Sequence, residues 1–398
     1  MASIKIINTV KYSKVLYGLY CLVGNVFVEI LKLFLKPDPK LVVFVTGGGK
    51  LMSDSPRSIY DMMCQDARFD DYKLIWAFRD VSKFSVPRGE KIQLDSFAYY
   101  RAVLKARVWV TNVSMTRGLS FTGINTFSLN SWHGTAIKMI GADVLDKSDA
   151  FTTKKKGKDD TIFLAQGDHD VEVWQRAFNI SPSRIVKTGL PRNDELVAWN
   201  NPDDIQRIKN KMGIPSDKKV ILYAPTFRDY EKQDGKYLVL APPVDFKKWE
   251  SALGDDYILL FRAHPSVVKV MNISVDNTFV RDVSTYPTLN ELMVVSDVMI
   301  SDYSSIMFDY SILGRPIIPY TYDFDHYQQT RGMYFDIRKE LYCAENEEDL
   351  ITLIKNKNLQ EIKDRTILFQ KKFVQEYGNA TNKALDLIYC AIQNDSYS

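Results

Sequence analysis

Two of the four histidines in this 398-residue chain lie where buried strands are expected to end. His133 follows the apolar run 126–130 and is itself followed by Gly134 and Thr135. A histidine changes its charge near neutral pH, and a small residue beside it lets a ligand approach the backbone closely. A histidine packed against the protein and satisfied by backbone groups is the plain alternative. The Gly134-Thr135 pair favours a ligand site over that alternative.

The second such histidine, His264, belongs to the sequence Arg262-Ala263-His264-Pro265 at the end of the apolar run 257–262. It places an imidazole and a guanidinium together at the end of another strand. Because two of four histidines occupy comparable strand ends, an active site is favoured over two unrelated packed histidines.

A third cluster, residues 224–229 (APTFRD), follows the apolar run 220–223. Thr226 can donate a hydroxyl hydrogen bond, and Arg228 can donate a bidentate pair, which are both suited to phosphate. A turn with a surface pair of Arg228 and Asp229 is an equally good interpretation of this cluster taken alone.

The fourth cluster, residues 301–310 (SDYSSIMFDY), carries the strongest signal. An apolar strand at 298–301 leads into a helix whose first N–H groups, with the hydroxyls of Ser304 and Ser305, form a site for a pyrophosphate. A plain helix cap that pairs Ser305 with Asp309 is the alternative. Asp309 could also reach a ribose, and Arg331 in the sequence RGMYFD adds a cation near the same face.

The apolar runs alternate with stretches of helical character, which predicts parallel sheets covered by helices on both faces. The candidate strands form two series: 41–45, 73–78, 91–94, 107–113 and 126–130, then 220–223, 257–262, 278–281, 298–301 and 316–320. A final helix is expected over 361–391. We therefore predict an α/β fold with two doubly wound, Rossmann-like domains and a cleft between them. Ligands bind beyond the carboxyl ends of strands in such sheets, and all four clusters lie there.

Three segments are expected along the chain, because the polar stretch 200–217 separates the two series of strands. They are an apolar helical segment at 1–36, an amino-terminal domain at 37–210 and a carboxyl-terminal domain at 211–398.

Composition narrows the functional class. Apolar residues make up 45% and charged residues 25% of the chain, which is typical of a folded protein, and a net charge of +3 gives no support for nucleic-acid binding.

The cysteines are scattered and are expected to be reduced in the cytosol: Cys21, Cys64, Cys343 and Cys390. No carboxylates cluster with metal spacing, so we expect neither a metal nor another cofactor. The lysine run 154–158 is expected to be a solvated loop or to lie against anionic lipid.

The segment 15–35 is the most apolar part of the chain and has lysines before and after it. It is long enough to span a bilayer but contains Asn25, Glu29 and Lys32, which an interfacial helix tolerates better. A helix packed on the protein's own core is the third possibility. We rank first a peripheral, monotopic attachment to an anionic membrane surface, on its cytoplasmic face.

The motifs His-Gly-Thr, APTFRD, RxHP, SDYSSIxFDY, GRPIIPY and RGxYFD, in this order between residues 131 and 336, resemble those of the CDP-glycerol glycerophosphotransferase family. Its members prime and polymerise teichoic acids and some capsules. The resemblance implies a GT-B fold, a CDP-alditol donor in the carboxyl-terminal domain and an acceptor in the amino-terminal domain, with His133 and His264 essential. Members often have a long amino-terminal extension that is not found here, which leads us to expect a primase or a short polymerase.

For this family the expected reaction is displacement of CMP from CDP-glycerol or CDP-ribitol by a hydroxyl of a lipid-linked, undecaprenyl-type acceptor. We assign His133 as general base, since an imidazole with a pKa of about 6.5 suits that task, and place Gly134 and Thr135 on the acceptor side. We expect six residues to bind the phosphates of the donor: His264, Arg262, Thr226, Arg228, Ser304 and Ser305. The roles of the two histidines could be exchanged.

Two other functional classes are open. One is a nucleotide-sugar glycosyltransferase or epimerase of the same architecture, against which the paired histidine motifs argue. The other is a non-catalytic scaffold that binds lipid or polyanion. Loss of catalysis should first remove His133 or His264, and both are present.

Overall fold

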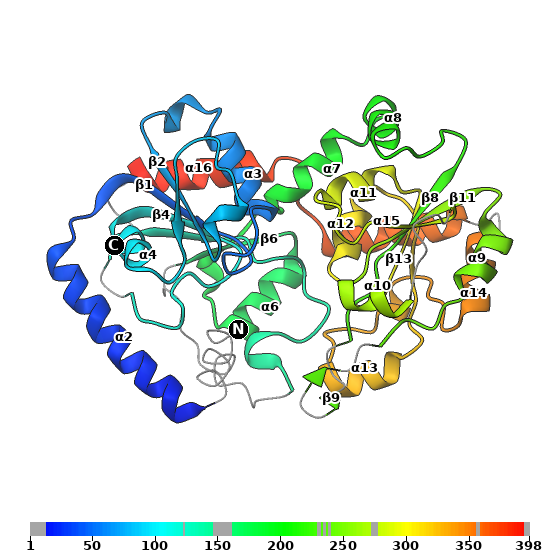
Figure 1. Cartoon of the computed structure of the whole chain (residues 1–398), viewed down its shortest axis with the longest axis horizontal. Coiled ribbons are helices and arrows are strands. Elements are labelled where there is room, and N and C mark those ends of the chain that lie inside the picture. Colours follow the sequence, from blue (N-terminus) through cyan, green and yellow to red (C-terminus); the bar gives the residue numbers. More distant parts are fainter. Residues whose placement is uncertain are drawn as a thin grey trace. The chain divides into compact units, whose positions relative to one another are not determined.

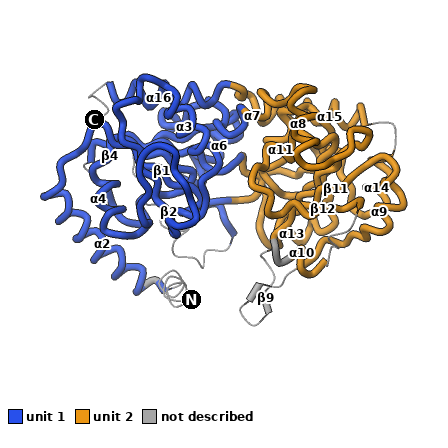
Figure 2. The backbone as a smooth tube through the Cα atoms, turned by 45° about the horizontal axis from the view of Figure 1, so that its top comes forward, with its two compact units in different colours: residues 1–134, 140–194, 379–398 blue, residues 135–139, 195–378 orange. Residues whose placement is uncertain are grey.

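A computed structural model describes residues 13–121, 124–145, 161–228, 232–233, 236–237, 240–271, 278–355 and 359–393. Within these residues the chain forms two compact units (Figure 2). Unit 1 comprises Met1–Gly134, Ile140–Asp194 and Asn379–Ser398, and unit 2 comprises Thr135–Met139 and Glu195–Gly378. These divisions differ from the predicted boundary at 210/211, because the chain passes into unit 2 after Asp194 and its last helix returns to unit 1.

Unit 1 is built on a parallel sheet of seven described strands in the order β3-β2-β1-β4-β5-β6-β7. The strands are β1 (Asp38–Val45), β2 (Lys73–Phe78), β3 (Glu90–Gln93), β4 (Ala106–Thr111), β5 (Phe127–Asn130), β6 (Ile162–Ala165) and β7 (Ile185–Lys187). Every residue of β4 and β5 is buried, as expected of central strands that are covered on both faces.

The helices of unit 1 cover both faces of this sheet (Figure 1). They are α2 (Lys14–Phe34), α3 (Asp54–Met63), α4 (Phe97–Lys105), α6 (Asp168–Phe178) and α16 (Ala380–Gln393). Helices α3 and α16 pack with Phe44 and Trp76 on one face, whereas α2 and α4 pack with Val43 and Trp109 on the other. Short 3₁₀ helices lie at Ala67–Phe69, Val81–Lys83, Gly141–Asp143, Pro182–Arg184 and Pro191–Asn193.

Unit 2 repeats this design with a parallel sheet of five described strands in the order β12-β11-β8-β13-β14. The strands are β8 (Lys219–Tyr223), β11 (Tyr257–Phe261), β12 (Val280–Asp282), β13 (Val298–Ser301) and β14 (Ile317–Pro319), with a separate antiparallel pair β9 (Lys232–Gln233) and β10 (Lys236–Tyr237). Its helices are α8 (Pro202–Lys211), α9 (Phe246–Leu253), α10 (Pro265–Met271), α11 (Leu289–Val295), α12 (Ile306–Ser311), α13 (Phe324–Arg331), α14 (Glu347–Lys355) and α15 (Leu359–Phe373), with a 3₁₀ turn at Ile337–Lys339. Helix α7 (Asp194–Ala198) begins at the last residue of unit 1.

The predicted fold class is confirmed, since two parallel sheets alternate with helices and an apolar helix lies near the amino terminus. Each predicted strand has a counterpart, whereas β6 and β7 were not predicted. The single helix expected over 361–391 is wrong. Gly378, at a φ of 82°, lies in the break between α15 and α16, and α16 buries Leu385 and Ile388 in the core of unit 1.

Helix α2 has two different faces. Ser13 caps its first turn, and its inner face buries Tyr17, Cys21, Val28 and Leu31. Polar groups on that face bind the segment after β4: the Tyr20 hydroxyl donates to the carbonyl of Arg117 at 2.9 Å, and the Asn25 Oδ1 accepts from the Ser120 N–H at 2.8 Å. The outer face exposes a continuous apolar stripe: Val15, Leu19, Leu22, Val23, Val26, Ile30, Leu33 and Phe34.

Candidate active site

His133 stands on a tight loop at the carboxyl end of β5. Trp132, in left-handed backbone conformation with a φ of 51°, donates its N–H to the Asn130 side chain at 2.8 Å, and its ring packs against Phe178 with centroids 4.5 Å apart. This anchoring leaves the neighbouring His133 side chain exposed, with its ring 4.2 Å from that of Trp132. Gly134 has a φ of 128°, which a residue with a side chain rarely adopts. The sequence His-Gly therefore has a conformational reason as well as a chemical one.

Thr135, predicted on the acceptor side, is fully buried, and the division between the units falls between Gly134 and Thr135. Its side chain is therefore not on the surface, whereas the imidazole of His133 is. The acceptor-side role of Gly134 and Thr135 stays a prediction.

A polar network that sequence reasoning missed lies beside His133 in unit 1. Asn112, directly after β4, accepts the N–H of Gly47 on its Oδ1 at 3.0 Å and donates its Nδ2 to Asp54 at 2.7 Å. Asp54, the first residue of α3, also accepts from Arg192 at 3.0 Å. The signals in the sequence were the glycine run 47–49 after a strand and an acidic residue at the following helix start.

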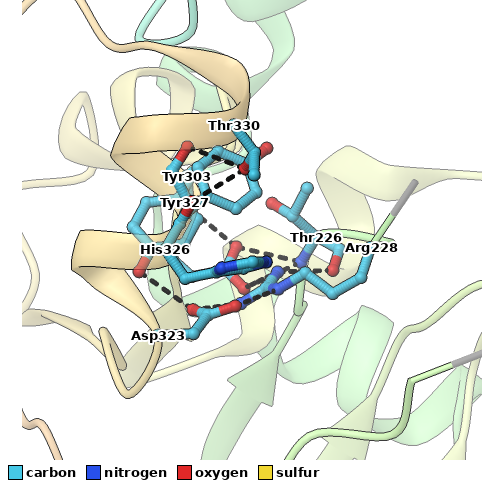
Figure 3. Close-up of polar contacts among 8 residues, drawn as sticks. Thr226, Arg228, Tyr303, Asp323, His326, Tyr327 and Thr330 are labelled. Atoms are coloured by element: carbon cyan, nitrogen blue, oxygen red, sulfur yellow. Dashed lines mark hydrogen bonds and ion pairs between the residues drawn. The ribbon is translucent and has the colours of Figure 1, made fainter. Parts of the chain in front are cut away.

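In unit 2 the ends of β8 and β13 are joined by a buried ion-pair cluster (Figure 3). The Arg228 guanidinium is 1% exposed, and it donates from Nη1 to Asp302 at 2.8 Å and from Nε to Asp323 at 2.7 Å. The rings of Tyr303, Tyr322 and Tyr327 surround it, each with its centroid 5.1–5.3 Å from the guanidinium carbon. Burial alone would lower the pKa of Arg228, but the two carboxylates raise it, so the side chain remains charged.

This cluster bears on the predicted roles of Thr226 and Arg228. Asp302 accepts the backbone N–H of Thr226 at 2.9 Å, so the Arg228–Asp302 pair holds the Thr226 loop in place. The geometry favours a positioning role for Arg228, and direct contact of Arg228 with a phosphate stays a prediction. The alternative of a surface pair fails for Arg228, which is buried, while Asp229 lies outside the described residues.

His264 lies at the end of β11 just before α10, where its side chain is exposed. Its ring lies 4.5 Å from that of Phe227, the residue between Thr226 and Arg228, so the second and third predicted clusters meet. Arg262 donates from Nη1 to the carbonyls of Val283 and Tyr286 at 3.0 and 2.8 Å, and burial lowers its pKa. Arg262 thus ties β11 to the following segment.

The Ser304-Ser305 pair is half-buried at the start of α12. The cap differs from the predicted one: the Ile306 N–H donates to the Ser304 hydroxyl at 3.4 Å, and Ser305 makes no side-chain cap bond. Asp309 is buried within α12, and Arg331 is the half-buried last residue of α13, the helix that Asp323 precedes. The residues predicted to bind the donor at the ends of β8, β11 and β13 therefore lie in one unit, with Asp309 on α12 and Arg331 on α13.

Among the described residues, no group of three histidine, cysteine or acidic side chains is arranged to hold a metal ion. A metal-free reaction stays a prediction, as does a reaction without another cofactor. The lysine run 154–158 lies outside the described residues.

Comparison with known proteins identifies a family, two similar curated proteins and a similar solved structure. Residues 28–390 match the family described as CDP-Glycerol:Poly(glycerophosphate) glycerophosphotransferase. A teichoic acid glycerol-phosphate transferase of Staphylococcus aureus is 34% identical over 374 residues, covering 89% of this chain and 94% of that protein. A teichoic acid poly(glycerol phosphate) polymerase of Staphylococcus epidermidis is 34% identical over 368 residues, covering 88% of this chain but 50% of that protein. This chain thus spans about half the length of one curated relative and nearly all of the other.

A solved structure of the wall teichoic acid polymerase TagF, in a variant soaked with CDPG, superposes with a TM-score of 0.82. It is 31% identical, and the match covers 92% of each chain. The two-unit architecture described above is therefore shared with an enzyme of teichoic acid synthesis.

Proposed function

Because this chain belongs to the CDP-glycerol:poly(glycerophosphate) glycerophosphotransferase family, we propose that it transfers glycerol phosphate from CDP-glycerol to a lipid-linked teichoic acid acceptor and releases CMP. The match over residues 28–390 confirms the family inferred from the motifs at the strand ends. The observation that carries the proposal is the similarity to a glycerol-phosphate transferase over 89% of this chain, with His133 and His264 exposed at strand ends. The glycosyltransferase and scaffold alternatives are not favoured.

Acceptor activation is assigned to unit 1. An acceptor hydroxyl attacks the phosphorus that carries glycerol, a new P–O bond forms, and the P–O bond to CMP breaks. The hydroxyl proton passes to the imidazole of His133, whose exposure lets it meet a substrate from solvent. Little covalent chemistry is asked of the protein, so positioning and charge stabilisation dominate.

Donor binding is assigned to unit 2. Among the described residues, the hydroxyl of Thr226 is buried and has no hydrogen-bond partner, which supports its assignment to a phosphate oxygen of the donor. His264 beside Phe227, and Ser304 and Ser305 two and three residues beyond Asp302, complete the proposed pyrophosphate pocket. Asp309 and Arg331 are assigned to its edge, where a ribose or a further phosphate oxygen would lie. Arg228 acts indirectly here, by holding the Thr226 loop through Asp302.

The direct test is CMP release from purified protein incubated with a lipid-linked teichoic acid acceptor and either CDP-glycerol, CDP-ribitol or a UDP-sugar. We expect CMP release with CDP-glycerol, and the length of the product separates priming from polymerisation. Release of a nucleotide only from the UDP-sugar would contradict the proposed function. Release from CDP-ribitol alone would keep the reaction and change the donor.

We further propose that α2 attaches the enzyme to the cytoplasmic membrane surface. By length and composition α2 could cross a membrane. Its inner face, however, is packed on unit 1 and hydrogen-bonded through Tyr20 and Asn25, whereas its outer face exposes the apolar stripe. Such a helix suits the interface between headgroups and acyl chains, with nearby lysines on anionic lipid.

The double variant Leu22→Glu, Val26→Glu is expected to lose about 100-fold in its partition onto anionic vesicles. Each substitution removes an exposed apolar side chain from the lipid, and two such losses amount to about 3 kcal/mol. Vesicle sedimentation measures the partition, and turnover of a water-soluble acceptor analogue should be unchanged.

Leu368→Glu on α15, which replaces an equally exposed leucine in unit 2, is the matched control and should bind vesicles normally. Undiminished binding of the double variant would contradict the interfacial attachment. Deleting 1–36 is a poorer test, because it would uncover buried Leu119 and Phe121, which share a core with α2.

A further inference from the structure

One ring nitrogen of His133 contacts a backbone carbonyl. Its Nδ1 lies 3.4 Å from the carbonyl oxygen of Asn112, at the end of the neighbouring strand β4. A carbonyl oxygen can only accept, so Nδ1 carries the proton in this contact. In a neutral imidazole the other nitrogen, Nε2, is then the basic one.

The Asn112 carbonyl can do this only if its peptide is held in place, and the Asn112 side chain holds it. The side chain is 4% exposed and is bound at both ends: its Oδ1 accepts from the Gly47 N–H after β1, and its Nδ2 donates to Asp54 at the start of α3. Three consecutive glycines after β1, all with positive φ, let that loop approach closely enough for the first bond. Asn112 therefore joins β1, β4 and α3 beside His133.

Asp54 is the charged member of this network. It has a φ of 66°, which costs free energy for a residue other than glycine, and it accepts from the Ser55 N–H at 2.6 Å and from Arg192 at 3.0 Å. Burial alone would raise the pKa of the Asp54 carboxyl, but Arg192 and the hydrogen bonds from Ser55 and Asn112 lower it below its ordinary value. Asp54 is thus ionised at neutral pH and accepts from Asn112 as a carboxylate.

We propose that Asp54 and Asn112 are positioning residues that hold His133 with its Nδ1 protonated and its Nε2 directed to the acceptor hydroxyl. The chain of contacts runs from the Asp54 carboxylate to the Asn112 side chain, and from the Asn112 carbonyl to His133. This inference rests on the proposed role of His133 as general base. Neither residue touches the reacting atoms.

The test compares Asp54→Asn, which keeps the shape of the side chain and removes its charge, with Asn112→Ala. Each should lower kcat by about 10- to 100-fold, because a small displacement of a catalytic group has an effect of that size. The Kd for CDP-glycerol, measured by calorimetry, should be unchanged. The acid limb of the pH profile should move to lower pH in Asp54→Asn, because the variant loses a negative charge near the imidazole and retains the positive charge of Arg192.

Thr126→Val is the matched control. It removes one buried hydrogen bond, from the Thr126 hydroxyl to the carbonyl of Ala106, at the opposite end of β4. A purely structural role predicts that Asp54→Asn and Asn112→Ala behave like this control at equal thermal stability, with an unmoved pH profile, and that outcome would overturn the inference. If His133→Ala itself retains activity, the proposed function of His133 fails first. If His133→Ala is inactive while Asp54→Asn is normal, only the positioning inference fails.

Discussion

Replacing His133 with alanine should reduce the transfer of glycerol phosphate by about 10²- to 10⁴-fold. The substitution removes the proposed base for the acceptor hydroxyl. It should leave the loop intact, because Trp132 anchors that loop through Asn130 and Phe178. CMP release under single-turnover conditions is the measurement, since it separates the chemical step from binding.

Two controls accompany this prediction. The Kd for CDP-glycerol should be unchanged in His133→Ala, because the residues that we assign to the donor belong to unit 2. His133→Gln, which keeps a polar side chain that cannot act as a base near neutral pH, should be as slow as His133→Ala. Near-normal turnover of either folded variant would show that His133 is not the base, and His264→Ala would then be the variant to examine.

Replacing Arg228 with alanine should lower the free energy of unfolding of unit 2 by about 3–5 kcal/mol. The substitution leaves Asp302, which is 2% exposed, and the partly buried Asp323 without their shared cation. Arg228→Lys should also be destabilising, because an ammonium cannot reproduce the paired bonds of a guanidinium to Asp323. Urea unfolding of each variant is the measurement.

Arg207→Ala is the matched control for this loss, because Arg207 forms an exposed ion pair with Asp204 in the same unit. It should change the free energy of unfolding by less than about 1 kcal/mol. An Arg228→Ala protein of normal stability that no longer binds CDP-glycerol would contradict the positioning role and assign the guanidinium directly to a phosphate.

The local sequence determined where most strands lie and which residues follow them. Short, continuous apolar runs such as 41–45 (LVVFV) favour strands buried on both faces, and alternation with helices favours parallel sheets. Because parallel strands present their carboxyl ends at one edge, the position of a residue just after a run was enough to place His133, His264 and Ser304 at strand ends.

The partners of each side chain were decided only by the tertiary structure, because they lie far away in the chain. Nothing near Arg228 in the sequence indicates that it is buried between Asp302 and Asp323, which lie 74 and 95 residues later. Asp54 and Asn112, 58 residues apart, drew no attention separately, and they meet because β1 and β4 are neighbours in the sheet.

The packing of the helices near the two ends of the chain, α2 and α16, also depends on residues that are distant in the sequence. The 21 residues of α2 have the composition of a spanning helix, and tertiary contacts such as those of Asn25 and Tyr20 with residues 117–120 show which face is turned inward. The helical pattern of 361–391 is local, but the place of α16 in unit 1 follows from which apolar surface remained to be covered. Sequence determined which segments form strands and helices, whereas burial and pairing across the fold decided which side chains face a substrate and which only hold others in place.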